Sequence, residues 1–146
     1  DARLKGEAAD DEAGFSVSEA GDVDGDGRGD ILVGADDHDD SGVNAGAAYL
    51  VLGAVTGDLS LASSDAKLLG EVANDGAGWT VEGAGDVNAD GFDDILIGAY
   101  MPLIGGATYL VLGPVSGTMS LSKKQQTPDT LARVRPPPPA PYRVWR

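Results

Sequence analysis

Two stretches of the sequence carry oxygen-bearing side chains at the spacing that a hard cation requires. In residues 22–30, DVDGDGRGD, aspartates stand at positions 1, 3, 5 and 9. In residues 86–94, DVNADGFDD, the same positions hold Asp, Asn, Asp and Asp. Alternate spacing turns successive side chains toward one centre, a glycine at position 6 allows the bend, and the position-7 carbonyl adds a fifth donor. The predicted ligands are Asp22, Asp24, Asp26, Arg28 and Asp30 in the first loop and Asp86, Asn88, Asp90, Phe92 and Asp94 in the second.

This donor set indicates calcium, with two ions per chain. Five protein oxygens suit calcium better than magnesium. Zinc and copper are disfavoured because the chain has no cysteine and one histidine. An EF-hand is excluded because position 12 is Val33 or Ile97 rather than Glu, and a strand pattern rather than a helix follows. The alternative is a pair of acidic hairpin turns without metal, which two matched loops disfavour.

The first loop also contains Arg28-Gly29-Asp30, the tripeptide that cell-adhesion receptors bind. A receptor ligand and a metal loop compete for the same carboxylate, that of Asp30. The second loop has Phe92-Asp93-Asp94 at the equivalent place, so the repeated pattern does not require the tripeptide. We therefore expect Asp30 to serve the loop and the tripeptide to occur by chance.

These loops lie inside a longer internal repeat. The segment from Leu4 to Ala35 matches the segment from Leu68 to Ala99 at an offset of 64 residues, and Ala45–Leu61 matches Gly105–Leu121 at an offset of 60. Short β-like segments separated by Gly, Asp and Asn occur at matched places in both halves. Four short strands in about 60 residues are typical of a propeller blade. A sandwich also fits short strands but does not require a repeat. The expected strands lie within residues 15–21, 30–35, 47–53 and 58–61 and within residues 79–85, 94–99, 107–113 and 118–121.

Charge divides the chain into an acidic body and a basic tail. Residues 1–122 carry 4 basic and 23 acidic groups, whereas residues 123–146 carry 6 basic and 1 acidic group together with 6 of the 8 prolines. The acidic body would repel nucleic acid and anionic lipid. No apolar run reaches the roughly 18 residues of a membrane span. We divide the chain into a first repeat (1–64), a second repeat (65–122) and a proline-rich tail (123–146).

The residues quoted above resemble FG-GAP repeats, the blades of the integrin α-subunit β-propeller and of many bacterial surface proteins. The resemblance is most specific from Gly21-Asp22-Val23-Asp24 through Gly34-Ala35 and from Gly85-Asp86-Val87-Asn88 through Gly98-Ala99. It departs from the usual dipeptides at Ala13-Gly14, Ala77-Gly78, Asp36 and Tyr100. It implies an all-β fold of propeller-type blades, with structural calcium in hairpin loops on one face and ligands, where present, on the opposite face.

Other chemically capable residues are interpreted as structural. His38 stands in DDHDDSGVN, and the second repeat has no histidine at the equivalent place. We expect a solvated acidic loop there; a weak extra cation site and a nucleophile–His–carboxylate site are the alternatives. The matched aromatic pairs Phe15/Trp79 and Tyr49/Tyr109 are expected in the blade core rather than in a sugar-binding platform.

The expected function is that of a non-enzymatic, calcium-stabilised module, extracellular or at the cell surface, for adhesion, protein interaction or structural self-assembly. A propeller closes with typically four to eight blades, so two repeats leave it incomplete. The expected partners are other copies, further FG-GAP blades or an extracellular protein ligand, and we expect the basic tail to pack along a neighbouring acidic body. The alternatives are a subunit of an open filament, a propeller fragment accessory to a hydrolase, and a lectin-like ligand binder with exposed aromatics beyond the repeated ones.

Overall fold

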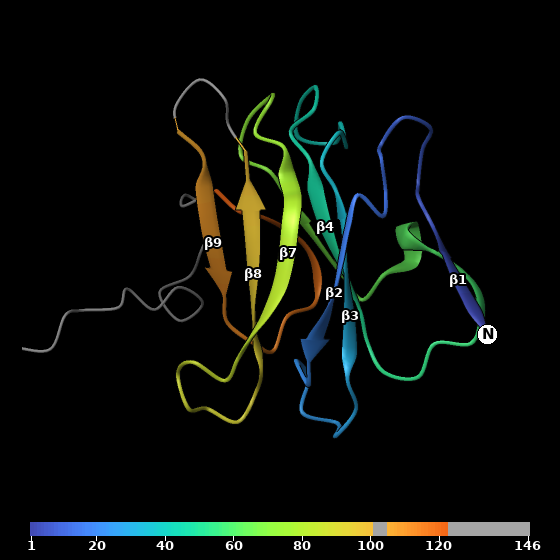
Figure 1. Ribbon diagram of the computed structural model, residues 1–146, viewed down its shortest axis with the longest axis vertical. Coiled ribbons are helices and arrows are strands. Elements are labelled where there is room, and N and C mark those ends of the chain that lie inside the picture. Colours follow the sequence, from blue (N-terminus) through green and yellow to red (C-terminus); the bar gives the residue numbers. More distant parts are fainter. Residues whose placement is uncertain (101–104, 123–146) are drawn as a thin grey trace, which may run out of the picture.

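The computed structural model describes residues 1–100 and 105–122, which form ten short strands and one 3-10 turn at Leu61–Ser63 (Figure 1). The expected all-β fold is confirmed. Within the described ranges, no helix is long and apolar enough to cross a membrane. The prediction for the tail concerns residues 123–146, which lie outside the described part. The strands are β1 (Ala2–Lys5), β2 (Ser16–Gly21), β3 (Asp30–Ala35), β4 (Ala47–Val51), β5 (Gly57–Ser60), β6 (Ala66–Leu69), β7 (Ala77–Gly85), β8 (Asp94–Ala99), β9 (Ala107–Val111) and β10 (Gly117–Ser120).

The strands form three sheets of unequal size. The largest has the order β10-β6-β4-β3-β2, in which β2, β3, β4 and β6 pair antiparallel and β10 lies parallel to β6. The second repeat forms the antiparallel sheet β7-β8-β9. The third sheet is the parallel pair β1-β5. Within the described residues, the first sheet therefore has four antiparallel strands and the second has three.

The outermost strands pair differently from the sequence-based expectation. Residues 58–61 and 118–121 were expected as the fourth antiparallel strand of each repeat. They contribute instead to β5 and β10, which pair in parallel with β1 and β6. The fourth antiparallel strand of the first sheet is β6, from residues just after position 64. The last strand of the second repeat, β10, thus pairs at the edge of the first sheet, and β5 of the first repeat pairs with β1 in the same way. These pairings join neighbouring sheets.

The core lies where the first sheet faces the second. Leu32, Leu50 and Leu68 from the first sheet share one buried cluster with Ile95 and Ile97 from the second. β7 lies beside β2 and β3 (Figure 1). Because a Cβ atom at Gly34 would overlap the Gly78 carbonyl, this close approach requires glycine. The Ser16 hydroxyl donates to the same carbonyl at 2.7 Å and links the sheets.

Candidate metal loops

The two predicted metal loops lie at the same end of their sheets. Residues 22–29 connect β2 to β3, residues 86–93 connect β7 to β8, and both loops project from the lower end of the molecule in Figure 1. In each sheet these are the two strands nearest the interface between the repeats. The repeat therefore places both loops on one face.

The first loop brings three of its predicted ligands together. One carboxylate oxygen from each of Asp22, Asp24 and Asp26 lies within 4.8 Å of the others, an arrangement that could hold a metal ion. Backbone N–H groups fix the three side chains: Gly27 donates to Asp22 Oδ2 (2.9 Å), Asp26 to Asp24 Oδ1 (3.0 Å) and Arg28 to Asp26 Oδ1 (2.9 Å). Asp22 Oδ1 is buried and has no hydrogen-bond partner in the described chain. A buried carboxylate oxygen without a donor fits a cation.

Asp30 lies apart from that acidic group and closes the base of the loop. Its side chain is 1% exposed, and its two oxygens accept from the N–H groups of Val23 and Gly53, both at 2.8 Å. The Arg28 side chain is exposed and lies near Asp26. Because the carboxylate of the Arg-Gly-Asp tripeptide is buried and bonded, the tripeptide is not presented at the surface.

The second loop has the same backbone plan with fewer free oxygens. Asp86 accepts from the N–H groups of Asp90 (3.0 Å) and Gly91 (2.9 Å), one on each oxygen. The Asn88 amide donates to Asp90 Oδ2 at 2.7 Å. These three predicted ligands are exposed, whereas Asp22 and Asp24 of the first loop are half-buried. The predicted ligands of the second loop therefore offer a cation one carboxylate fewer and less shelter.

Asp94 closes the second loop as Asp30 closes the first. It is fully buried and accepts from the N–H groups of Val87 and Gly113, both at 2.9 Å. The two equivalent aspartates thus make the same pair of bonds, one inside the loop and one to the segment after the third strand of the sheet. These bonds tie each loop to its own sheet.

The loops also contact each other, which sequence reasoning missed. Asp93 Oδ2 accepts from the Asp22 N–H at 2.8 Å, and the Asp93 N–H donates to the Asp22 carbonyl at 2.9 Å. The Phe92 ring lies over Gly25, where an added Cβ would sit 2.8 Å from a ring carbon. Sequence reasoning considered only the carbonyl of Phe92. The available signal was Asp93 itself, which replaces the glycine at that position of the first loop.

The sequence profile of the FG-GAP repeat matches residues 14–51 and 73–111, more than half of the chain. The protein belongs to the FG-GAP repeat family. Each matched range spans the first three strands of one sheet together with its acidic loop. No curated protein matches the chain at a significant level.

The first FG-GAP repeat contains a second charged cluster around His38, which is buried rather than solvated as expected. Its Nδ1 lies 2.9 Å from Asp11 Oδ2, and its Nε2 lies 3.1 Å from Asp40 Oδ2 and 3.6 Å from Glu7 Oε2. Glu7, His38 and Asp40 could hold a metal ion. However, the Lys67 ammonium already contacts Glu7 (2.6 Å) and Asp40 (3.0 Å) and supplies the cation there.

Lys67 extends this cluster across the sheet to Tyr49. Its ammonium lies 5.8 Å from the centre of the Tyr49 ring, which is fully buried as predicted. Burial of the ammonium opposes its charge, but hydrogen bonds to Glu7 and Asp40 raise the pKa of Lys67 above its usual value. The pKa of Asp40 is lowered mainly by its hydrogen bond to Lys67 and secondly by its hydrogen bond to His38. No local sequence signal indicates this cluster, because Lys67 meets Tyr49 only through the pairing of β6 with β4.

Of the other matched aromatics, Tyr109 is half-buried and packs against the core cluster, whereas the pair Phe15 and Trp79 lies at the surface. Phe15 and Trp79 are both exposed, which corrects the prediction of a core position. Their ring centres are 4.7 Å apart, and Trp79 stacks on the exposed Tyr100 at 5.1 Å. A hollow beside Trp79 and Tyr100 is lined by Asp36, Asp37, Asn44 and Asn74. The predicted core position would have required another element over these rings, and none of the described residues supplies it.

Proposed function

We propose that this FG-GAP chain is a non-enzymatic, calcium-stabilised β-propeller module for adhesion, protein interaction or structural self-assembly. The observation that carries the proposal is the pair of equivalent acidic loops at one end of adjoining sheets. Loops of this kind, locked to each other and to the strands, stabilise a scaffold whose other surfaces remain free for partners.

Calcium is the proposed ion, one in each loop. Asp22, Asp24 and Asp26 would hold the first, with the Arg28 carbonyl and Asp30 as further donors; the five predicted ligands of the second loop would hold the second. The buried, unpartnered Asp22 Oδ1 supports the fit. When bound, the ion neutralises crowded carboxylates. Extracellular modules bind calcium at roughly 10⁻⁴ to 10⁻³ M, which is sufficient outside cells and supports an extracellular or cell-surface location.

A non-enzymatic role is supported by how the polar groups are used. The Ser16 hydroxyl donates to a backbone carbonyl of the other repeat. His38 contacts three acidic side chains, and the hydroxyl 3.4 Å from its Nδ1 belongs to the buried Tyr49, whose pKa burial raises, so that this phenol is a poor nucleophile. Since a nucleophilic mechanism requires a base beside the nucleophile, these contacts favour a scaffold over a hydrolase accessory. The acidic surface disfavours nucleic acid as a partner.

A lectin-like role is the second candidate, and the aromatic surface favours it. Tyr100 has no aromatic counterpart in the first repeat, where Asp36 stands, and it adds an exposed ring to the Phe15–Trp79 pair. A sugar ring can pack its C–H face on aromatic carbon while its hydroxyls bond amides and carboxylates. Asp36 Oδ1, in the adjacent hollow, is buried and has no hydrogen-bond partner in the described chain. Oligosaccharide binding that Trp79→Ala abolishes would support this role.

Thermal unfolding in calcium and in excess chelator tests the main proposal. A ligand that binds only the folded state raises the melting temperature by mass action, so chelation should lower it and magnesium should restore it poorly. Asp24→Ala and Asp90→Ala should each remove part of the calcium response. Asp58→Ala, which removes a surface carboxylate outside both loops, is the matched control and should retain the full response. A melting curve unchanged by chelator would contradict the proposal.

A further inference from the structure

The two smaller sheets together contain a repeat counterpart of every strand in the largest sheet. By repeat equivalence, β7-β8-β9 corresponds to β2-β3-β4, and the parallel pair β1-β5 corresponds to β6-β10. The complete order β10-β6-β4-β3-β2 would be reproduced as β5-β1-β9-β8-β7 if β1 paired with the outer edge of β9. No described strand occupies that edge of β9 or the free edge of β1. The ends of the molecule thus carry complementary parts of one blade.

Burial at equivalent positions shows where neighbours are absent. Val17 is 66% exposed, whereas its counterpart Val81 is 8% exposed because the first sheet covers it. In the opposite direction, Val23 is fully buried by the second repeat, whereas its counterpart Val87 is 53% exposed. The second repeat therefore leaves its Leu96 side open. On the first repeat, Leu4, Leu59 and Leu61 cover most of the side opposite the second repeat, and the part around Val17 stays exposed.

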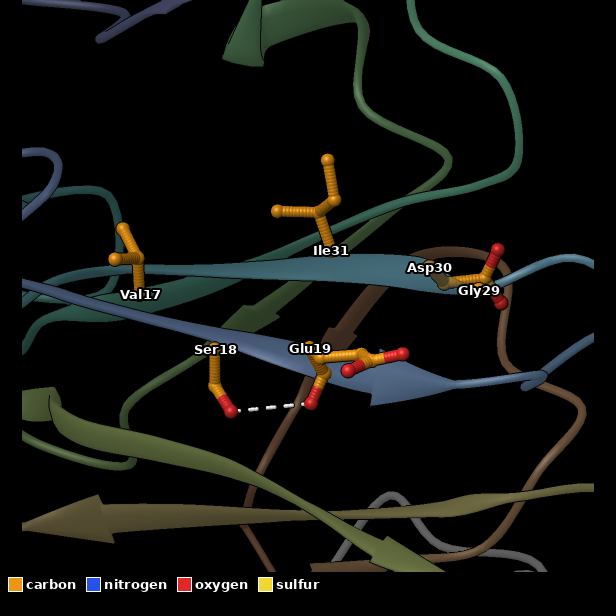
Figure 2. A pocket seen from close by; sticks show the side chains of 6 residues that line it. All are labelled: Val17, Ser18, Glu19, Gly29, Asp30 and Ile31. Atoms are coloured by element: carbon orange, nitrogen blue, oxygen red, sulfur yellow. Dashed lines mark hydrogen bonds between the residues drawn. The ribbon is translucent and has the colours of Figure 1, made fainter.

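The exposed part of the first repeat around Val17 is hollowed. Figure 2 shows an open depression over β2 and β3, lined by six residues, in which the Val17 and Ile31 side chains project from the same side of the strands. The counterparts of these two residues, Val81 and Ile95, are buried against Leu32 and Leu50. An apolar surface like that of Leu32 and Leu50 therefore fits the depression. The second repeat offers one, because Leu96 and Leu110 at the equivalent positions are only half-buried.

Charge also matches across the two ends. Where β6 pairs with β4, Lys67 lies opposite Tyr49 and bonds Glu7. In the second repeat, Tyr109 is the counterpart of Tyr49, and Glu71 is the counterpart of Glu7. The pKa of Tyr109 is raised mainly by burial and secondly by the charge of Glu71. Within residues 1–100 and 105–122, Glu71 forms no ion pair. The counterpart of Lys67 in β1 is Arg3, which is exposed and forms an ion pair with Asp58.

We propose that copies of this chain associate head to tail, with β1 of one copy paired antiparallel to the outer edge of β9 of another. The register follows from that of β4 and β6: Thr108 opposite Leu4, and Tyr109 opposite Arg3, whose guanidinium then meets Glu71. The Leu96 side of the copy that provides β9 covers the Val17 depression of the copy that provides β1. This inference rests on the proposed role in interaction and assembly, and it names the partner and the surface.

The contact is heterologous, because the two copies present different surfaces. Each copy keeps one free β1 end and one free β9 end, so addition continues until a ring closes or a filament extends. A free strand edge is also a template for pairing with another chain.

Cysteine cross-linking in the full-length chain tests this pairing. The chain has no cysteine, so Leu4→Cys and Thr108→Cys introduce the only thiols. Under mild oxidation, a mixture of the two single variants should form a disulfide-linked dimer, and either variant alone should remain largely uncross-linked. The double variant should form a ladder of oligomers. In Figure 1, β1 and β9 lie at opposite sides of the molecule, so a disulfide within one chain is not expected.

The control is a shift of one residue. Lys5→Cys mixed with Thr108→Cys should cross-link far less, because adjacent strand residues point to opposite faces. Adding Val17→Asp to the Leu4→Cys variant should reduce the dimer yield, since it places a charge in the proposed apolar contact. Equal yields in the matched and shifted mixtures would contradict the proposal. So would a wholly monomeric mixture. Calcium-dependent melting is measured separately, so failure of the cross-link leaves the proposed calcium-stabilised module intact.

Discussion

Replacing Asp30 by Asn should destabilise the protein even when no calcium is available. Asn keeps one carbonyl oxygen, so it can accept from only one of the two N–H groups, of Val23 and Gly53, that Asp30 now satisfies. A buried donor left without a partner costs about 1–3 kcal/mol. At roughly 4 °C per kcal/mol for a chain of this size, the melting temperature in chelator should fall by about 4–12 °C.

The assay is thermal unfolding of wild type and variant in chelator and again in calcium. Asp24→Asn is the matched control. Asp24 is a predicted ligand in the same loop, but the bond that it accepts from the Asp26 N–H is exposed, so its loss should cost little stability. This control should melt close to wild type in chelator and below it in calcium. If Asp30→Asn melted like wild type in chelator and lost stability only in calcium, Asp30 would be a metal ligand without a structural role, and the reasoning would be refuted.

Three further predictions concern other parts of the molecule. Asp93→Ala should weaken calcium binding in the first loop, because it removes the acceptor for the Asp22 N–H; calcium titration of a variant whose second loop is disabled checks this. Asn88→Asp should strengthen calcium binding in the second loop by adding a carboxylate, which the same titration measures. Lys67→Met should destabilise the protein most at intermediate pH. Because the pKa of Asp40 is lowered from its usual 3.8, the stability that the ionised Asp40 contributes is lost as the pH falls below that value. Because the pKa of Lys67 is raised from its usual 10.5, the stability that the charged Lys67 contributes is lost as the pH rises above that value. Melting temperatures of wild type and variant should therefore converge at both extremes, and a difference that is constant across pH would contradict the assignment.

The features that local spacing determines could be predicted from the sequence. The loop at residues 22–30 follows from the alternation of aspartates and the glycine at position 6, and its backbone bonds run between near neighbours. The strands from β2 to β4 and from β7 to β9 follow from short apolar runs bounded by turn residues. Tyr49 was placed correctly because its strand is apolar throughout and all five residues are buried.

Features that depend on distant neighbours could not be predicted in this way. The pairing of β1 with β5 and of β6 with β10 joins segments about 50 residues apart, and no local pattern specifies a parallel partner. His38 was expected in solvent because its neighbours are acidic, yet those acids and Lys67 enclose it. Phe15 and Trp79 are apolar and matched, but their exposure depends on what covers them. Burial is a property of the neighbouring surface as well as of the residue itself.

The central claim is that both loops hold calcium, and anomalous scattering from crystals grown in millimolar calcium tests it most directly. We expect two calcium peaks per chain, one among Asp22, Asp24 and Asp26 and one among Asp86, Asn88 and Asp90, with the first more fully occupied. Crystals soaked in chelator should lose both peaks. Two loops that stay empty in millimolar calcium, with the side chains bonded only to backbone N–H groups, would contradict the account.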